Sequence, residues 1–175
     1  MEPMLIQHVM PELTSSEPFL RSRACWLYGE FGSFKYENEP TLKQAIDGVY
    51  KNLFSEELPV RLSAAVALSR LLDNKTAQDF LRPALRSIFE VYLKTIEEIE
   101  SEDLVQSLNE FMTVFQNDIA PFTVQIATNL TSQYQRLIKV DFNDDDGEST
   151  LAAVGVVSAI CNIVSAAQND PANLK

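Results

Sequence analysis

The apolar residues of this chain recur at helical spacing along almost its whole length, and this period restricts the chain to helical folds. In residues 42–54, apolar side chains follow one another in steps of three and one, which places them on one face of an amphipathic helix. The same steps recur in residues 64–72, 81–99 and 119–138. No stretch shows the sustained alternation of apolar and polar residues that is typical of strands. The sequence therefore predicts an all-α protein.

Prolines and capping residues divide the expected helices. Pro18, Pro40 and Pro59 stand where a helix begins, because a proline in the first turn loses no hydrogen bond. Pro121 stands near the start of a later helix, and Pro83 predicts a break or kink between a short lead-in and a long helix. The expected helices lie near residues 3–13, 19–34, 40–54, 58–72, 83–99, 102–116, 120–140 and 149–167.

Equivalent positions recur along the chain. The pair Arg21-x-x-Ala24 matches Arg61-x-x-Ala64 after 40 residues. A helical-hairpin period of about 40–47 residues is the signature of HEAT or armadillo arrays. We expect one segment of a right-handed α-solenoid with about four HEAT-type hairpins, which fits seven or more helices better than the alternative, a closed bundle. It is expected to span residues 1–175, with repeats near 1–13 (partial), 18–54, 58–99, 102–140 and 149–175 (partial), and an acidic loop at 141–148. Neither end shows evident capping, so we expect a longer solenoid around it.

The charge of the chain is concentrated in two runs. The chain has 14 basic and 25 acidic residues, a net charge of −11. Five acids lie between Glu97 and Asp103, and five more lie between Asp141 and Glu148. The rest of the chain is nearly neutral. A direct nucleic-acid partner is not expected, because phosphate contacts require a basic face, whereas basic protein segments are the natural complement.

The repeat geometry predicts where these acids lie. In a stack of hairpins, the connections between pairs fall on one edge. Both acidic runs belong to such connections, and so do the earlier acids Glu17 and Glu56-Glu57. An acidic edge would attract basic protein cargo by electrostatics rather than through a shaped pocket. The alternative is a row of solvated loops that only maintains solubility. The candidate contacts with basic cargo are Asp141, Asp144, Asp145, Asp146 and Glu148.

No arrangement typical of an enzyme or a cofactor site is found in the sequence. His8 is the one histidine, Cys25 and Cys161 are far apart, and no zinc motif is present. The pair Gly29-Glu-Phe-Gly32 lies inside a helical pattern and is no phosphate loop. We therefore expect a binding protein without enzymatic activity and without a cofactor.

The acidic loop fails the test for a calcium site. The pattern Asp141-x-Asn143-x-Asp145 resembles the start of a calcium loop, which then needs glycine at its sixth position and glutamate at its twelfth. Asp146 and Ala152 occupy those positions, so no metal is expected.

Residues 151–167 form an uncharged stretch of 17 residues, slightly shorter than a usual membrane span of about 20. Its small and polar residues, including Ser158, Asn162 and Ser165, favour a helix buried within the solenoid over membrane insertion. The start of the chain lacks the pattern of a secretory signal, and two cysteines indicate a reducing compartment.

A family resemblance follows from three motifs. The segment Leu20-Arg21-Ser22-Arg23-Ala24-Cys25-Trp26 resembles a helix of importin-β superfamily receptors in the branch of importins seven and eight. The segments 58–68 and 119–124 are similar to later helices of those receptors, in the same order. An acidic connection followed by a small-residue helix occurs at the corresponding place. The resemblance covers the chain from about Met4 to Asp170.

This resemblance implies a central HEAT-repeat fragment of a nuclear transport receptor, or karyopherin, that carries proteins through the nuclear pore and moves between cytoplasm and nucleus. It implies basic cargo such as ribosomal proteins or histones, control by Ran-GTP through the full-length receptor, and contact with Phe-Gly nucleoporins. The alternative is a HEAT-repeat scaffold subunit of a phosphatase or another multi-protein complex. The spacing of 40 residues from Arg21 to Arg61, the next spacing of about 44 residues to the segment Leu104-Val105-x-x-Leu108, and a long acidic insert favour transport.

Overall fold

The structure is a computed structural model that describes residues 1–99 and 101–119, together with positions 126–128, 130–132, 135, 157 and 161. The chain divides into two compact units, Met1–Val91 and Tyr92–Lys175, and each is described by itself. The predicted acidic loop 141–148 and most of the last two predicted helices lie outside the described residues.

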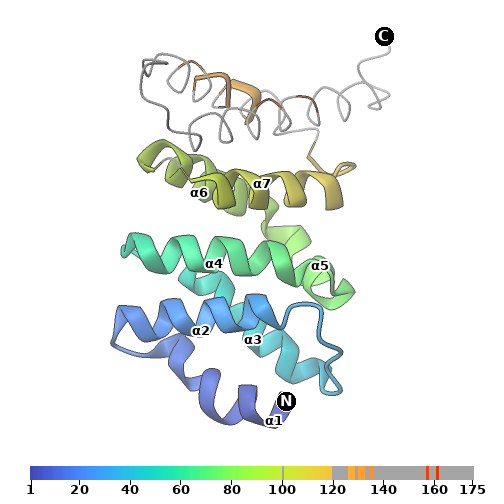
Figure 1. Ribbon diagram of the computed structural model, residues 1–175. Coiled ribbons are helices and arrows are strands. Elements are labelled where there is room, and N and C mark those ends of the chain that lie inside the picture. The colour runs from blue at the N-terminus through green and yellow to red at the C-terminus, as the bar shows by residue number, and fades with distance from the viewer. Residues whose placement is uncertain are drawn as a thin grey trace. The chain divides into compact units, whose positions relative to one another are not determined.

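Within this part of the chain every regular element is a helix, and no strand occurs (Figure 1), so the predicted all-α class is confirmed. The break expected at Pro83 is present, because a short 3₁₀ turn separates two α-helices there. The elements are α1 (Glu2–Met4), the π-helical η1 (Leu5–Val9), the 3₁₀ turn η2 (Pro11–Thr14), α2 (Pro18–Glu30), α3 (Glu39–Asn52), α4 (Leu58–Leu71), α5 (Lys75–Leu81), the 3₁₀ turn η3 (Arg82–Ala84), α6 (Leu85–Glu98) and α7 (Glu102–Val114).

The helices begin where prolines and capping side chains place them. Pro18, Pro40 and Pro59 each lie in the first two positions of a helix, where the missing N–H has no helical partner to lose. The side chain of Asn38 accepts a hydrogen bond from the backbone N–H of Thr41 and so caps α3. These local signals explain why the helix starts could be predicted closely.

The core of the first unit is built around α2 and α4, which run side by side, with α3 packed against both (Figure 1). The two helices approach closely because small residues line the contact. A Cβ added to Gly29 would lie 2.9 Å from the Cα of Ala67. Ser22 Oγ and Ser63 Oγ are 2.7 Å apart and share a hydrogen bond. Both contacts join residues about 40 positions apart, so α2 and α4 are parallel and equivalent, as the period predicts.

The second unit is described mainly through the end of α6 and the whole of α7. The rings of Tyr92 and Phe111 meet edge to face with their centroids 5.4 Å apart, and Phe111 stacks on Phe115 at 5.9 Å. All three side chains are buried, so this aromatic cluster joins the two helices within the unit. The grouping of helices into repeats and the right-handed superhelix stay predictions.

No helix among the described residues is long and apolar enough to cross a membrane. The uncharged stretch 151–167 lies outside these residues except for positions 157 and 161.

Candidate partner-binding edge

The five acids predicted to contact cargo, Asp141, Asp144, Asp145, Asp146 and Glu148, lie outside the described residues. The structure does describe the other acids assigned to the same predicted edge. These are Glu17 before α2, Glu56 and Glu57 before α4, and the acids around the start of α7.

The connections before α2 and α4 have the same internal hydrogen bonds. Arg21 Nη1 donates to the carbonyl oxygens of Ser15 at 2.7 Å and Ser16 at 3.3 Å. Forty residues later, Arg61 Nη1 donates to the carbonyl oxygens of Ser55 and Glu56, both at 2.9 Å. Each connection is therefore fixed by a guanidinium from the helix that follows it. We call these hydrogen bonds an arginine latch.

A second hydrogen bond is also repeated in these connections. The Ser15 hydroxyl oxygen accepts from the backbone N–H of Glu17 at 3.3 Å, and Ser55 accepts from Glu57 at the same distance. With the latch, this bond holds the backbone of each connection in a defined turn. The acids that follow are thus carried on ordered backbone.

The acids of the first unit lie on a common edge. Because α2 and α4 are parallel and packed side by side, their amino-terminal ends lie at the same edge (Figure 1). Glu17 is the N-cap of α2, and Glu57 is the N-cap of α4. Glu17, Glu56 and Glu57 are exposed, and no ion pair joins them to any other described residue. Helix amino termini also favour nearby negative charge, which adds about 0.3–1 kcal/mol of stability for each acid. The edge therefore presents three exposed carboxylates that no ion pair with a described residue holds, beside the guanidiniums of Arg21 and Arg61.

The connection before α7 differs from the other two. Ser101 caps the helix by accepting from the backbone N–H of Leu104 at 3.4 Å, and Glu102 and Asp103 occupy its first turn. The arginines of the other two connections lie four residues after the N-cap of their helix, and the same position here holds Val105. The hydroxyl of Ser107 donates to the carbonyl oxygen of Asp103. This connection is acidic without an arginine latch.

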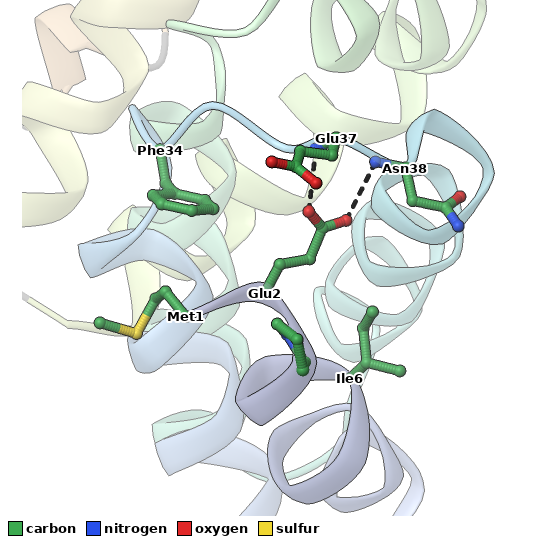
Figure 2. Close-up of a pocket in the computed structure, with 7 residues that line it drawn as sticks. Met1, Glu2, Ile6, Phe34, Glu37 and Asn38 are labelled. Carbon is green, nitrogen blue, oxygen red and sulfur yellow. Dashed lines mark hydrogen bonds between the residues drawn. The ribbon is translucent and has the colours of Figure 1, made fainter.

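A hollow of about 290 Å³ lies at the start of the chain (Figure 2). The buried carboxylate of Glu2 points into it and accepts hydrogen bonds from the backbone N–H groups of Glu37 at 2.8 Å and Asn38 at 3.1 Å. This carboxylate holds the 31–38 connection in place. The hollow is lined by Met1, Glu2, Pro3, Ile6, Phe34, Glu37 and Asn38.

The residues considered for chemistry are not brought together. Cys25 is buried, and burial raises the pKa of its thiol from 9.0 to about 12, so it stays protonated and unreactive at neutral pH. His8 is exposed on the first helical segment. Among the residues described, no group of three histidine, cysteine, aspartate or glutamate side chains could hold a metal ion.

Sequence reasoning missed two features, the arginine latches and a stacked pair on α2. The guanidinium carbon of Arg23 lies 4.3 Å from the ring centroid of Trp26, on the solvent side of the helix. The recurrence of Arg21 and Arg61 was visible in the sequence, although their hydrogen bonds were not. The spacing of Arg23 and Trp26 could have indicated their contact.

These parallel helices, repeated after 40 residues with matching connections, define a helical-repeat protein of the HEAT type. Comparison with known proteins makes the assignment specific. The chain is 32% identical over 171 residues to a probable importin-7 homolog of Dictyostelium discoideum. These aligned residues make up 98% of the chain and 16% of that relative. It is 32% identical over 173 residues to the importin beta-like SAD2 homolog of Arabidopsis thaliana, covering 98% of the chain and 17% of the relative. Human importin-8 is 28% identical over 171 residues, or 97% of the chain and 16% of the relative.

The chain thus belongs to the importin-β family, whose architecture is the HEAT-repeat α-solenoid, and the resemblance to the importin seven and eight branch is confirmed. The chain spans about a sixth of the length of the relatives it matches. No protein-family profile and no solved structure match it.

Proposed function

We propose that this chain works in a nuclear transport receptor as a scaffold that binds basic protein cargo along its acidic edge. The family assignment supports the transport role, since the relatives are importins that match nearly the whole chain. The observation that carries the cargo-binding role is the edge formed by Glu17, Glu56 and Glu57. Its acids are exposed, and the nearby guanidiniums of Arg21 and Arg61 are hydrogen-bonded to backbone carbonyls.

The proposed attraction is electrostatic. Exposed charge pairs contribute about 0.2–1 kcal/mol each, so no single acid is decisive and the row acts together. The loop acids Asp141, Asp144, Asp145, Asp146 and Glu148 are proposed to extend the same row. Cargo of ribosomal-protein or histone type has the complementary charge.

The remaining roles belong to the proposal for the complete receptor. Release or loading of cargo under Ran-GTP, contact with Phe-Gly nucleoporins and movement between cytoplasm and nucleus all follow from the transport role. The scaffold itself performs no chemistry in this proposal, consistent with the helical-repeat architecture and with relatives that are named as importins.

The test is binding of a lysine- and arginine-rich peptide to the chain, followed by fluorescence anisotropy across a salt series. We expect saturable binding that weakens with salt. The triple variant Glu17→Gln, Glu56→Gln, Glu57→Gln should weaken binding at least about threefold at low salt and flatten the salt dependence. A second variant with the five loop acids changed to Asn or Gln should act in the same direction.

The matched control is the triple variant Glu37→Gln, Asp73→Asn, Asp79→Asn. It removes the same charge from exposed acids that lie beyond the opposite ends of α2 and α4. An equal loss of affinity in this control would show that only the overall charge matters. Unchanged affinity in the five-site variant would remove the loop from the binding surface.

A further inference from the structure

The outer face of α2 carries aromatic rings. Phe19, Arg23, Trp26 and Glu30 follow one another at steps of four, three and four, which places them on one stripe of the helix. Phe19 is 68% exposed and Trp26 is 39% exposed, while the opposite face of the helix is buried. Two large rings exposed on one stripe near an acidic edge indicate a surface that can contact a partner.

The ring of Trp26 already contacts a cationic group, the guanidinium of Arg23. The guanidinium carbon of Arg23 lies 4.3 Å from the ring centroid, well inside the distance of about 6 Å at which a cation is attracted by an indole face. Both side chains are exposed, so this contact can open to solvent at little cost. Arg23 therefore occupies a site that a guanidinium or ammonium group from another molecule fits equally well.

We propose that Trp26 is the anchor for an arginine or lysine side chain of a bound basic peptide, and that Arg23 covers this ring until the peptide displaces it. The inference rests on the proposed function, since it names a contact for the same basic partner. Glu17 lies nine residues before Trp26, about 13 Å along the helix axis. Nine residues are also about two and a half helical turns, so Glu17 lies on the other side of α2 and the anchor is a contact separate from the acidic edge.

Two other kinds of partner would interact with Arg23 in a different way. An acidic partner would be drawn to this cation, and an apolar partner would need only the rings of Phe19 and Trp26. A basic peptide instead gains when Arg23 is removed, because a competing guanidinium and a repelling charge disappear together. The sign of the effect of Arg23→Gln therefore distinguishes a basic from an acidic partner.

Trp26 is the one tryptophan of the chain, so its fluorescence reports directly on the proposed site. The probe is an arginine-rich peptide, titrated into the 175-residue chain and followed by tryptophan emission and by anisotropy of a label on the peptide. We expect a saturable change in emission. Arg23→Gln should tighten binding about two- to fivefold, and Trp26→Leu should weaken it by a similar factor.

Phe54→Leu is the control, because Phe54 is an exposed aromatic residue, 45% exposed, that lies off the stripe. Its affinity should match that of the unchanged chain, and circular dichroism should show the same helix content for all three variants.

The outcomes separate the two proposals. Salt-sensitive binding by anisotropy with unchanged tryptophan emission and full affinity in Trp26→Leu would overturn the anchor and leave the acidic edge standing. Weaker peptide binding in Arg23→Gln, or binding of a glutamate-rich peptide that this change abolishes, would overturn the anchor in favour of an acidic partner. Absence of any anisotropy change at low salt would overturn both proposals.

Discussion

Arg61 lies 40 residues after Arg21 and repeats its hydrogen bonds, with one guanidinium nitrogen donating to two carbonyl oxygens of the preceding connection. In each case the arginine belongs to the helix that the connection introduces. The connection and the first turns of its helix are thereby joined by side chain as well as by main chain. The repeat in the sequence is therefore also a repeat of hydrogen bonds.

Replacing Arg21 by Met should lower the free energy of unfolding. The substitution keeps a long apolar stem and removes the charged donor from the carbonyl oxygens of Ser15 and Ser16. Hydrogen bonds to charged groups contribute about 1.5–3 kcal/mol, and partial exposure reduces the expected loss here to about 1–2 kcal/mol. Urea denaturation followed by circular dichroism measures it. Arg86→Met is the control, because Arg86 makes only an exposed ion pair with Glu90; equal losses in the two variants would contradict the latch.

Replacing Gly29 by Ala should destabilise the contact between α2 and α4. The added Cβ would lie 2.9 Å from the Cα of Ala67, which can move only with its helix. Overpacking costs about 1–3 kcal/mol, and the gain in helix propensity offsets about 1 kcal/mol of this. We expect a net loss of about 1 kcal/mol in urea denaturation.

Gly48→Ala provides the comparison for Gly29→Ala. Its Cβ would meet the flexible end of Leu13 at 2.8 Å, so rotation of that side chain can relieve the contact. The helix propensity gained should leave stability within about 0.5 kcal/mol of the unchanged chain. A Gly29→Ala variant as stable as Gly48→Ala would show that α2 and α4 can separate freely.

Replacing Glu2 by Gln should loosen the 31–38 connection. The two oxygens of the Glu2 carboxylate accept from two backbone N–H groups, and the amide of glutamine offers only one oxygen (Figure 2). The N–H left without an acceptor costs about 1–3 kcal/mol. Hydrogen exchange at Glu37 or Asn38 should become at least about tenfold faster. The exposed Glu39→Gln is the control, and equal exchange in both variants would exclude a structural role for Glu2.

Stability should fall in alkaline solution. Burial raises the pKa of Cys25 to about 12, with Arg21 opposing the shift, and burial also raises the pKa of Tyr36 to about 12. The unfolded chain releases these protons at lower pH than the folded chain, so the folded state binds more protons between about pH 9 and 12. The free energy of unfolding therefore decreases as the pH rises through this range.

For Cys25 alone, the expected loss at pH 10.5 is about 2 kcal/mol relative to pH 7.5. Urea denaturation at the two pH values measures it, and Cys25→Ala should show a shallower dependence on pH. Equal stability of the unchanged chain at both values would contradict the buried thiol.

Much of the fold could be predicted because its signals are local. The apolar period defines the buried faces, Pro18 and Pro59 mark helix starts, and Pro83 marks the break between α5 and α6. The parallel arrangement of α2 and α4 followed from the 40-residue period. Each of these features depends on residues close in sequence or on simple repetition.

The details of the candidate site depend on contacts that no local pattern encodes. The hydrogen bonds of Arg21 and Arg61 require the path of the connecting backbone, and the contact of Glu2 with residues 37 and 38 joins segments 35 residues apart. The stacking of Arg23 on Trp26 is the exception, because residues three apart on a helix are neighbours. The loop acids Asp141, Asp144, Asp145, Asp146 and Glu148 stay a prediction.

The contact between α2 and α4 has a mechanical consequence. Where Gly29 meets Ala67 and Ser22 meets Ser63, the two surfaces consist of backbone and of side chains too short to change shape. This contact cannot adapt by side-chain rotation, so a displacement of either helix moves α2 and α4 together. The same contact continues past the end of α2, because a Cβ added to Gly32 would lie 2.5 Å from the carbonyl oxygen of Arg70, so the 31–38 connection begins as part of this rigid contact.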